Sequence, residues 1–264
     1  MAKKPRFDPF VFTTRAPWMQ RTCDLVRSGH HLYLQGEIPL ERAAYLAEKF
    51  ERLYDVGLDR LQASRARKDG AASARLLFLS LPDKNNLAWL LLRTEGQLSP
   101  AAAEVREKWR DAYEDRIKYD RFEMVRLPRA GQIKPAYTWR YTRNAYDTIR
   151  DSIVYAISSK HDEQLKVLIG GIFHSPGFAG IRSQVIKLVD LIKSDWKRAR
   201  KAGSPMPTIP EHLGYVRRIA DKGKRVSMLI KENQKPADKE VELAPEKEQE
   251  IPVEENNSGD SSAS

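Results

Sequence analysis

The chain of 264 residues is poor in the residues that make disulfides and metal sites. It has a single cysteine, Cys23, which excludes an internal disulfide and a zinc site built from cysteines. No apolar run reaches the length of a membrane span, and the first residues contain no apolar segment of the kind that directs secretion. We therefore expect a cytoplasmic protein without a membrane partner.

The sequence also lacks the patterns of familiar catalytic and cofactor sites. Five histidines are present, and none has the spacing of a metal-binding pair. There is no Gly-rich phosphate loop, no dinucleotide-binding fingerprint and no Gly-x-Ser-x-Gly motif. These patterns predict no cofactor, no metal and no catalytic residue, so an enzymatic role is not favoured.

One enzymatic alternative comes from YTWRYTRNAYDTIRD, residues 137–151, which places tyrosines beside arginines. Tyr141 or Tyr146 could attack a DNA phosphate while the arginines hold the developing charge. Relaxases also need a paired-histidine metal site, and tyrosine recombinases need a spread Arg–His–Arg set, and neither can be assembled from this sequence. Sheet aromatics beside exposed arginines are the simpler interpretation.

The charge of the chain is divided unevenly. Residues 232–264 hold ten acids and three lysines, a net charge of −7. Because the whole chain carries +10, residues 1–231 carry +17. An excess of this size is typical of a protein with a polyanionic partner, although a basic charge that only confers solubility is the alternative. The acidic end of the chain is predicted to compete with such a partner for the basic surface.

The apolar pattern predicts an α+β fold. Residues 75–81 and 87–94 are apolar runs on either side of PDKNN, and residues 121–127 and 137–141 flank PRAGQIKPA, so each pair reads as a β-hairpin. We expect the two hairpins to form one small antiparallel sheet packed by several helices. The expected helices are residues 17–27, 39–65, 99–117, 142–156, 162–172 and 182–201.

Three parts are expected along the chain. Residues 1–14 read as a loose basic and aromatic arm, residues 15–231 as a single α+β domain, and residues 232–264 as a disordered acidic tail.

Three basic segments make up the predicted nucleic-acid-binding surface: the second hairpin, the helix at 182–201 and the segment at 217–225. Their cations can neutralise phosphates. They are Arg126, Arg129, Lys134, Arg140, Arg143, Arg182, Lys187, Lys193, Lys197, Arg198, Arg200, Lys201, Arg217, Arg218, Lys224 and Arg225. Strand alternation puts Tyr137, Trp139 and Tyr141 on one face, which either stacks on bases or packs in the core; the core is favoured.

The run from the second hairpin through YTWRYT to PGFAGIRSQVIKLVDLIKSDWKRAR resembles uncharacterised accessory proteins carried on bacterial plasmids and integrative conjugative elements. The resemblance covers about the middle and C-terminal half of the chain. It implies a mobile genetic element as the context and DNA as the polyanion, and it assigns no catalytic residue.

We therefore expect a non-enzymatic DNA-binding accessory protein that acts in maintenance, replication, transfer or regulation of a bacterial mobile element. RNA is an alternative partner, because groove geometry is not written in one sequence. A protein–protein interaction module with a basic face is a second alternative. The sequence indicates neither the oligomeric state nor a sequence preference.

Overall fold

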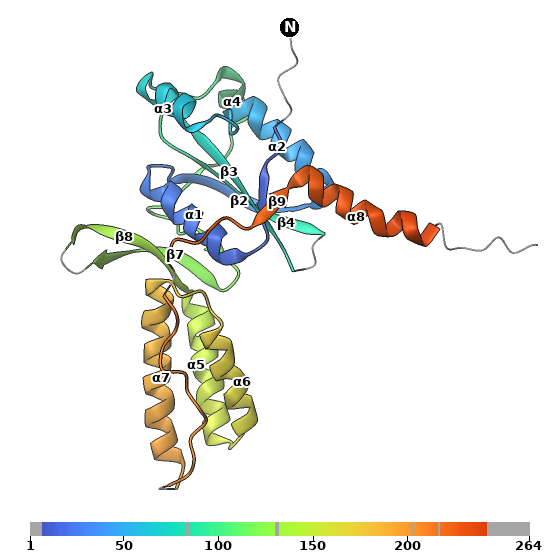
Figure 1. Cartoon of the computed structure of the whole chain (residues 1–264). Helices are drawn as coiled ribbons and strands as arrows, with labels where there is room; N and C mark the ends of the chain where they lie inside the picture. Colours follow the sequence, from blue (N-terminus) through green and yellow to red (C-terminus); the bar gives the residue numbers. More distant parts are fainter. Residues whose placement is uncertain (1–6, 83–84, 130–131, 202, 216, 242–264) are drawn as a thin grey trace, which may run out of the picture.

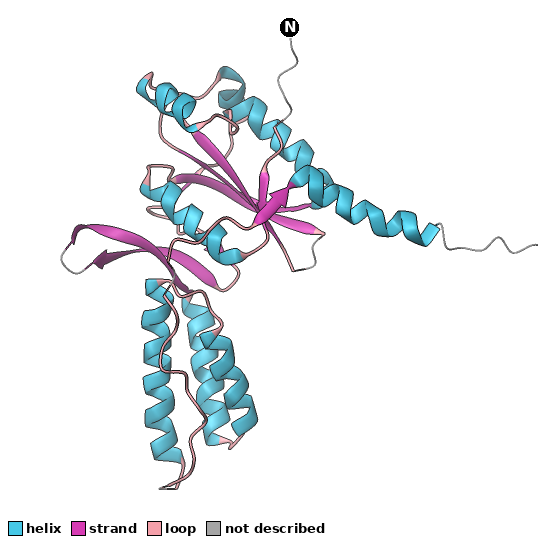
Figure 2. Cartoon of the chain, viewed as in Figure 1, coloured by secondary structure: helices cyan, strands magenta, loops and turns pink. Residues whose placement is uncertain are grey.

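The computed structural model describes residues 7–82, 85–129, 132–201, 203–215 and 217–241, without the side chains of residues 129, 132–135 and 234–241 (Figure 1). Helices and strands are mixed along the chain, which confirms the α+β class (Figure 2). Two sheets form the upper part of the molecule, and a group of helices extends away from the second sheet.

The first sheet is mixed and has six strands. Their order across the sheet is β5 (Arg110–Asp111), β2 (Leu32–Pro39), β4 (Asn86–Arg93), β3 (Ala74–Ser80), β1 (Phe10–Phe12) and β9 (Gly223–Arg225). The expected hairpin of β3 and β4 is confirmed, with Ala74 opposite Arg93. On its two sides, β2 pairs antiparallel with β4 along its whole length, and β1 pairs parallel with β3.

The second sheet contains the other expected hairpin. Its strands are β6 (Lys118–Tyr119), β7 (Phe122–Arg129) and β8 (Gln132–Tyr141), and Phe122 lies opposite Tyr141. The expectation of one small sheet made from both hairpins is therefore wrong. Because β2 and β1 already occupy the two edges of the first hairpin, no edge of it is free to pair with β7 or β8.

The described residues form eight helices. They are α1 (Arg15–Arg27), α2 (Leu40–Tyr54), α3 (Arg60–Lys68), α4 (Pro100–Glu104), α5 (Arg143–Ser158), α6 (Asp162–Phe173), α7 (Ala179–Ala199) and α8 (Val226–Val241).

Two long helices expected from the sequence are shorter in the structure. The one expected at 39–65 is divided into α2 and α3, because Asp55 takes a left-handed conformation with φ of 49° and the Asp59 carboxylate caps a new helix. The one expected at 99–117 starts at the Ser99 cap as predicted but ends at Glu104. Arg106, with φ of 47°, turns the chain toward β5.

Helices α5, α6 and α7 form a bundle that projects from the second sheet (Figure 1). The Thr142 hydroxyl accepts a hydrogen bond from the backbone N–H of Ala145, which confirms the expected cap of α5. At its start α7 approaches β8 so closely that a Cβ atom on Gly180 would lie 2.5 Å from the carbonyl oxygen of Trp139. After α7 the chain runs back along the bundle to β9; we call residues 203–222 the return segment.

Buried side chains cover both faces of the first sheet. On one face, α2 packs Phe50 and Leu53 against strand residues such as Phe78. On the other face, α1 joins a larger cluster that continues through Trp139 of β8 to Ile192 of α7. This continuous core attaches the helical bundle to the sheets.

The two ends of the described chain take part in this body. Residues 10–12, expected in a loose arm, form β1 between β3 and β9. Residues 232–241, expected at the start of a disordered tail, continue α8. Residues 1–6 and 242–264 lie outside the described residues.

Candidate nucleic-acid interface

The structure brings two of the three predicted basic segments, the second hairpin and the segment at 217–225, to one hollow, and none of the cations predicted at 182–201 lines it. A hollow of about 510 Å³ lies between α1, the β7–β8 hairpin, the start of α7 and the return segment. Its lining includes Leu127 and Tyr137 of the hairpin, Phe178 before α7, and Arg217 and Arg218 of the return segment. Segments that are about 80 residues apart in sequence therefore share one surface.

The return segment is held in this hollow by α1. The side-chain amide of Gln20 donates to the carbonyl oxygen of Arg217 (3.0 Å) and accepts from the backbone N–H of Ile219 (3.0 Å). Arg218 pairs with Asp24 at 2.5 Å, and Arg21 donates to the carbonyl oxygen of Ile219. These contacts fix an extended segment and leave the Arg217 side chain exposed beside the hollow.

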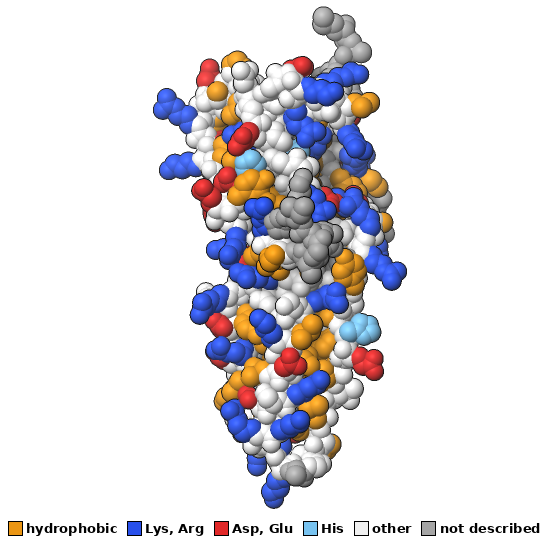
Figure 3. Space-filling model, turned by 90° about the vertical axis from the view of Figure 1, so that its left-hand side faces the viewer, with side chains coloured by type: hydrophobic (Ala, Val, Ile, Leu, Met, Phe, Trp, Pro, Cys, Tyr) orange, Lys and Arg blue, Asp and Glu red, His pale blue; other side chains and the backbone are white. Residues whose placement is uncertain are grey.

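The spacing of α7 produces two different faces, as the sequence predicted. Ile181, Val185, Leu188 and Ile192 are buried in the core, one or two turns apart. Lys187, Lys193 and Lys197 on the outside of α7, and Lys201 just after its end, are exposed and form no ion pair with any other described residue. Figure 3 looks onto the side where α7 lies in Figure 1, and Lys and Arg side chains run down this face with fewer Asp and Glu among them.

Several predicted contact residues are instead bound within the protein. Arg140 donates to the Glu123 carboxylate at 2.8 Å, and Arg198 pairs with Asp195 at 3.0 Å. Lys224 pairs with Glu232 at 2.6 Å. Because their charge is already partly neutralised, these cations are weaker candidates for phosphate contacts.

Arg200 is the clearest structural cation of the predicted set. Its guanidinium pairs with Asp162 of α6 and lies 4.6 Å from the ring centroid of Trp196, and its side chain is only 9% exposed. Arg182 similarly lies over the ring of Tyr215, and Arg225 donates to the carbonyl oxygen of Asp8.

The hairpin presents fewer cations than expected. Arg126 is exposed opposite Tyr137, and Arg143 is exposed at the start of α5, where it pairs with Asp147 at 3.6 Å. The side chains of Arg129 and Lys134 lie outside the described residues.

Two of the three aromatic side chains on this face of β8 pack in the core. Trp139 is fully buried and donates its indole N–H to the carbonyl oxygen of Met19 at 2.9 Å, and Tyr141 is also buried. Tyr137 is half-buried and stacks on Tyr113, which stacks in turn on His31 at 4.4 Å. This stack was not predicted, because its three rings come from segments more than 20 residues apart.

Arg27 is a further cation that the sequence analysis missed. It lies exposed at the end of α1 and lines the hollow beside Arg217. Arg27 lies in the last turn of α1, where the negative end of the helix dipole favours a cation. Because the dipole already explains this residue, the sequence contains no signal that points to a ligand.

The environment of the tyrosines argues against a nucleophilic role. The hydroxyl of Tyr141 is buried against that of Ser175, and burial raises the pKa of Tyr141. Burial also raises the pKa of Tyr146. A raised pKa keeps a phenol protonated and makes it a poorer nucleophile.

The environment of Cys23 also argues against a nucleophilic role. Burial raises the pKa of the Cys23 thiol to about 12, which keeps it protonated. In the described part of the chain, no three His, Cys, Asp or Glu side chains are grouped so that they could hold a metal ion. Nor is any helix there long and apolar enough to cross a membrane.

The fold and surface together define a mixed α+β protein with a projecting helical bundle in which α7 is the basic helix. Comparisons of the chain with protein-family models, with curated proteins and with solved structures found no match. Any assignment of function therefore depends on the surface itself.

Proposed function

We propose that the protein is a non-enzymatic DNA-binding accessory protein of a bacterial mobile element, and that the outer face of α7 is its main contact surface. The carrying observation is the group of exposed lysines at 187, 193, 197 and 201, which have no ion-pair partner among the described residues. Lys187 and Lys197 are ten residues apart, about 15 Å along a helix. Such a row can neutralise several phosphates of one duplex.

The hollow at the start of α7 extends this surface toward the body. Arg27 and Arg217 line it, and Arg126 is exposed on the adjoining hairpin. The mobile-element context is supported only by the resemblance in sequence described above. The role of the protein in maintenance, replication, transfer or regulation would follow from the DNA it selects.

Duplex binding by the full chain at several salt concentrations tests the proposal. For a DNA contact surface, the logarithm of the affinity falls linearly with the logarithm of the salt concentration, by about 0.9 for each phosphate contacted. Replacing Lys193→Gln and Lys197→Gln together should lower the affinity about tenfold and make this slope shallower by roughly 2.

The matched control is the pair Arg65→Gln and Lys68→Gln in α3, which removes the same charge from another exposed basic helix. It should change the affinity less than about twofold. An equal loss in both double variants would mean that only total charge matters, and would contradict a surface on α7. Tighter, equally salt-dependent binding to duplex RNA would replace DNA as the partner.

A further inference from the structure

A separate hollow of about 520 Å³ lies at the start of β3; we call it the β3 hollow. Strand β1 pairs with β3 only at Phe78 and Leu79, so no strand covers this side of β3 at Arg75 and Leu76. The other walls come from α1, the loop between α2 and α3, the end of the return segment and β9. The volume is within the range of small-molecule sites.

Part of the wall of the β3 hollow is apolar. Phe10 of β1, Leu25 of α1, Leu58 of the loop and Leu77 of β3 line it, and each of them is partly exposed. Apolar side chains that water reaches inside a hollow favour a ligand with an apolar body.

Arg75 lines the same hollow and lies on the same face of β3 as Leu77. It is partly buried, and its Nη1 donates to the carbonyl oxygen of Ala74 at 3.1 Å. The edge of the guanidinium formed by Nε and Nη2 has no hydrogen-bond or ion-pair partner among the described residues. Neither atom is enclosed, so a ligand can reach this edge.

The charge of Arg75 is not neutralised within the described protein. Burial and the neighbouring charge of Arg67 lower the pKa of Arg75, and the carboxylate of Asp59 offsets this only in part. A partly buried cation without a paired carboxylate is costly, so an anion from outside the chain is favoured beside it.

The carboxylates that line the β3 hollow are already paired with other arginines. Asp24 pairs with Arg21 at 3.0 Å and with Arg218 at 2.5 Å. Asp221 pairs with Arg21 at 2.8 Å. These pairs hold α1 to the return segment and leave Arg75 as the cation that lacks a carboxylate.

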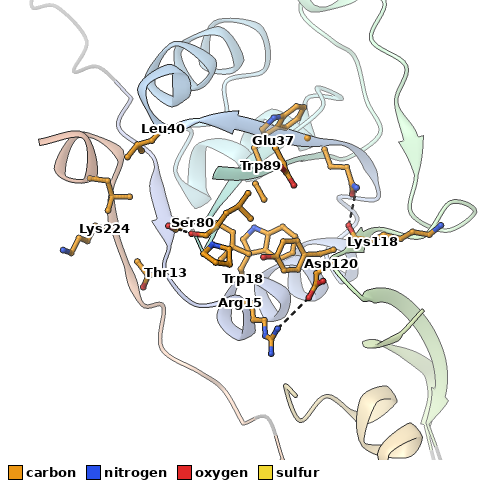
Figure 4. A pocket seen from close by; sticks show the side chains of 18 of the residues that line it. Thr13, Arg15, Trp18, Glu37, Leu40, Ser80, Trp89, Lys118, Asp120 and Lys224 are labelled. Atoms are coloured by element: carbon orange, nitrogen blue, oxygen red, sulfur yellow. Dashed lines mark hydrogen bonds and ion pairs between the residues drawn. The ribbon is translucent and has the colours of Figure 1, made fainter. Parts of the chain in front are cut away.

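A larger hollow of about 1110 Å³, at the start of α1, offers a contrast (Figure 4). Arg15 there lies 3.9 Å from Asp120, and Glu37 adds a second carboxylate to the lining. Lys118 points away from the space, as Figure 4 shows. The charges of this larger hollow therefore do not favour an anion, although its volume is greater.

We propose that the β3 hollow binds a small organic carboxylate, with the acid group held by Arg75 and the apolar body against Phe10, Leu58 and Leu77. The two N–H groups on one edge of a guanidinium match the two oxygens of a carboxylate. The proposal does not rest on DNA binding, because the face of α7 takes no part in this hollow.

Calorimetric titration of the full chain with three compounds tests the proposal. Octanoate has both an acid group and an apolar body, and it should bind with a Kd below about 1 mM. Octanamide keeps the apolar body without the charge, and acetate keeps the charge without the apolar body. Each should bind at least about tenfold more weakly than octanoate.

Arg75→Met removes the charge and keeps an unbranched side chain. Octanoate affinity should fall at least about tenfold, whereas octanamide affinity should stay within about twofold. The melting temperature should hold or rise, because an apolar side chain replaces a cation without a paired carboxylate. Arg67→Met is the matched control: it removes a nearby exposed charge that does not line the hollow, and should change octanoate affinity less than about threefold.

The proposal is overturned if octanoate does not bind below about 1 mM, if octanamide binds equally well, or if Arg75→Met binds octanoate like the unchanged chain. A lower melting temperature in Arg75→Met would mean that Arg75 serves the fold, and would also contradict the proposal. The comparison of the three compounds on the unchanged chain keeps the test decisive if that variant does not fold. The double variant Lys193→Gln, Lys197→Gln should bind octanoate normally, so failure of this site and failure of the α7 surface are distinguishable.

Discussion

Three of the four cations of α3 lie in its last turn, whereas those of α7 are spread along the helix from its first turns onward. Arg65, Arg67 and Lys68 close a helix of nine residues that buries only Ala63. Cations at that end complement the helix dipole, so α3 needs no partner to explain them. In α7, Lys187 and Lys193 lie far from the dipole end, and the opposite face is anchored in the core. Exposed cations on two helices thus have different meanings.

The largest expected effect is a loss of stability caused by a substitution at the contact between α7 and β8. Gly180→Val would place a side chain against the backbone of Trp139 and the Cβ of Arg140, and neither can move freely. We expect a loss of about 3 kcal/mol in the free energy of unfolding, at the upper end of overpacking costs. Chemical denaturation measures it. Gly171→Ala in α6, where an added Cβ meets no atom within 4 Å, is the control and should leave stability unchanged or slightly raised.

Acid should destabilise the body through His30, which lies near α3. Burial, with the charges of Arg75 and Arg67 nearby, lowers the pKa of His30 to about 4. The neutral form is therefore favoured on folding, so this contribution is complete above the unfolded pKa near 6.5 and is lost as pH falls toward 4.

Between pH 7 and pH 4 the expected loss from His30 is about 2–3 kcal/mol. Denaturation midpoints measured across this range test it. His30→Asn should flatten that part of the profile, whereas the same change at the exposed His174 should not. An unchanged slope in His30→Asn would show that other groups cause the acid sensitivity.

Local signals in the sequence predicted much of the fold. The Ser99 and Thr142 caps, both hairpins and the two faces of α7 depend on residues within a few positions of one another, and the structure contains them. Strand β2 was missed because Gly36 and Pro39 interrupt its apolar pattern. Its pairing partner β4 is more than 45 residues away. Pairing over such a distance leaves no local trace.

The candidate surface was predictable in charge but not in pairing. Exposed Lys193 and Lys197 follow from helical spacing alone. The ion pair of Arg200 with Asp162 joins residues 38 positions apart, and that of Arg218 with Asp24 joins residues 194 positions apart. Periodicity in one helix cannot identify which of its cations a distant carboxylate will neutralise.

Arg200 and Lys197 should separate stability from binding. Arg200→Gln removes the ion pair with Asp162 and the contact with Trp196, and should lower the free energy of unfolding by about 1 kcal/mol. Because this guanidinium is 9% exposed, duplex affinity should stay within about twofold. Lys197→Gln should instead lower duplex affinity and leave the free energy of unfolding nearly unchanged. A larger loss of DNA binding in Arg200→Gln than in Lys197→Gln would contradict the division.

The smallest effect should come from the dipole itself. Lys68→Glu places a negative charge at the negative end of α3, and should cost about 0.5–1 kcal/mol at low salt. Lys193→Glu, on the outer face of α7 and more than a turn from its end, should cost less than half of that. Thermal unfolding at low and at high salt compares the two, since screening removes the dipole contribution. If both changes cost the same at every salt concentration, the dipole does not account for the cations of α3, and its basic turn becomes a candidate contact surface beside that of α7.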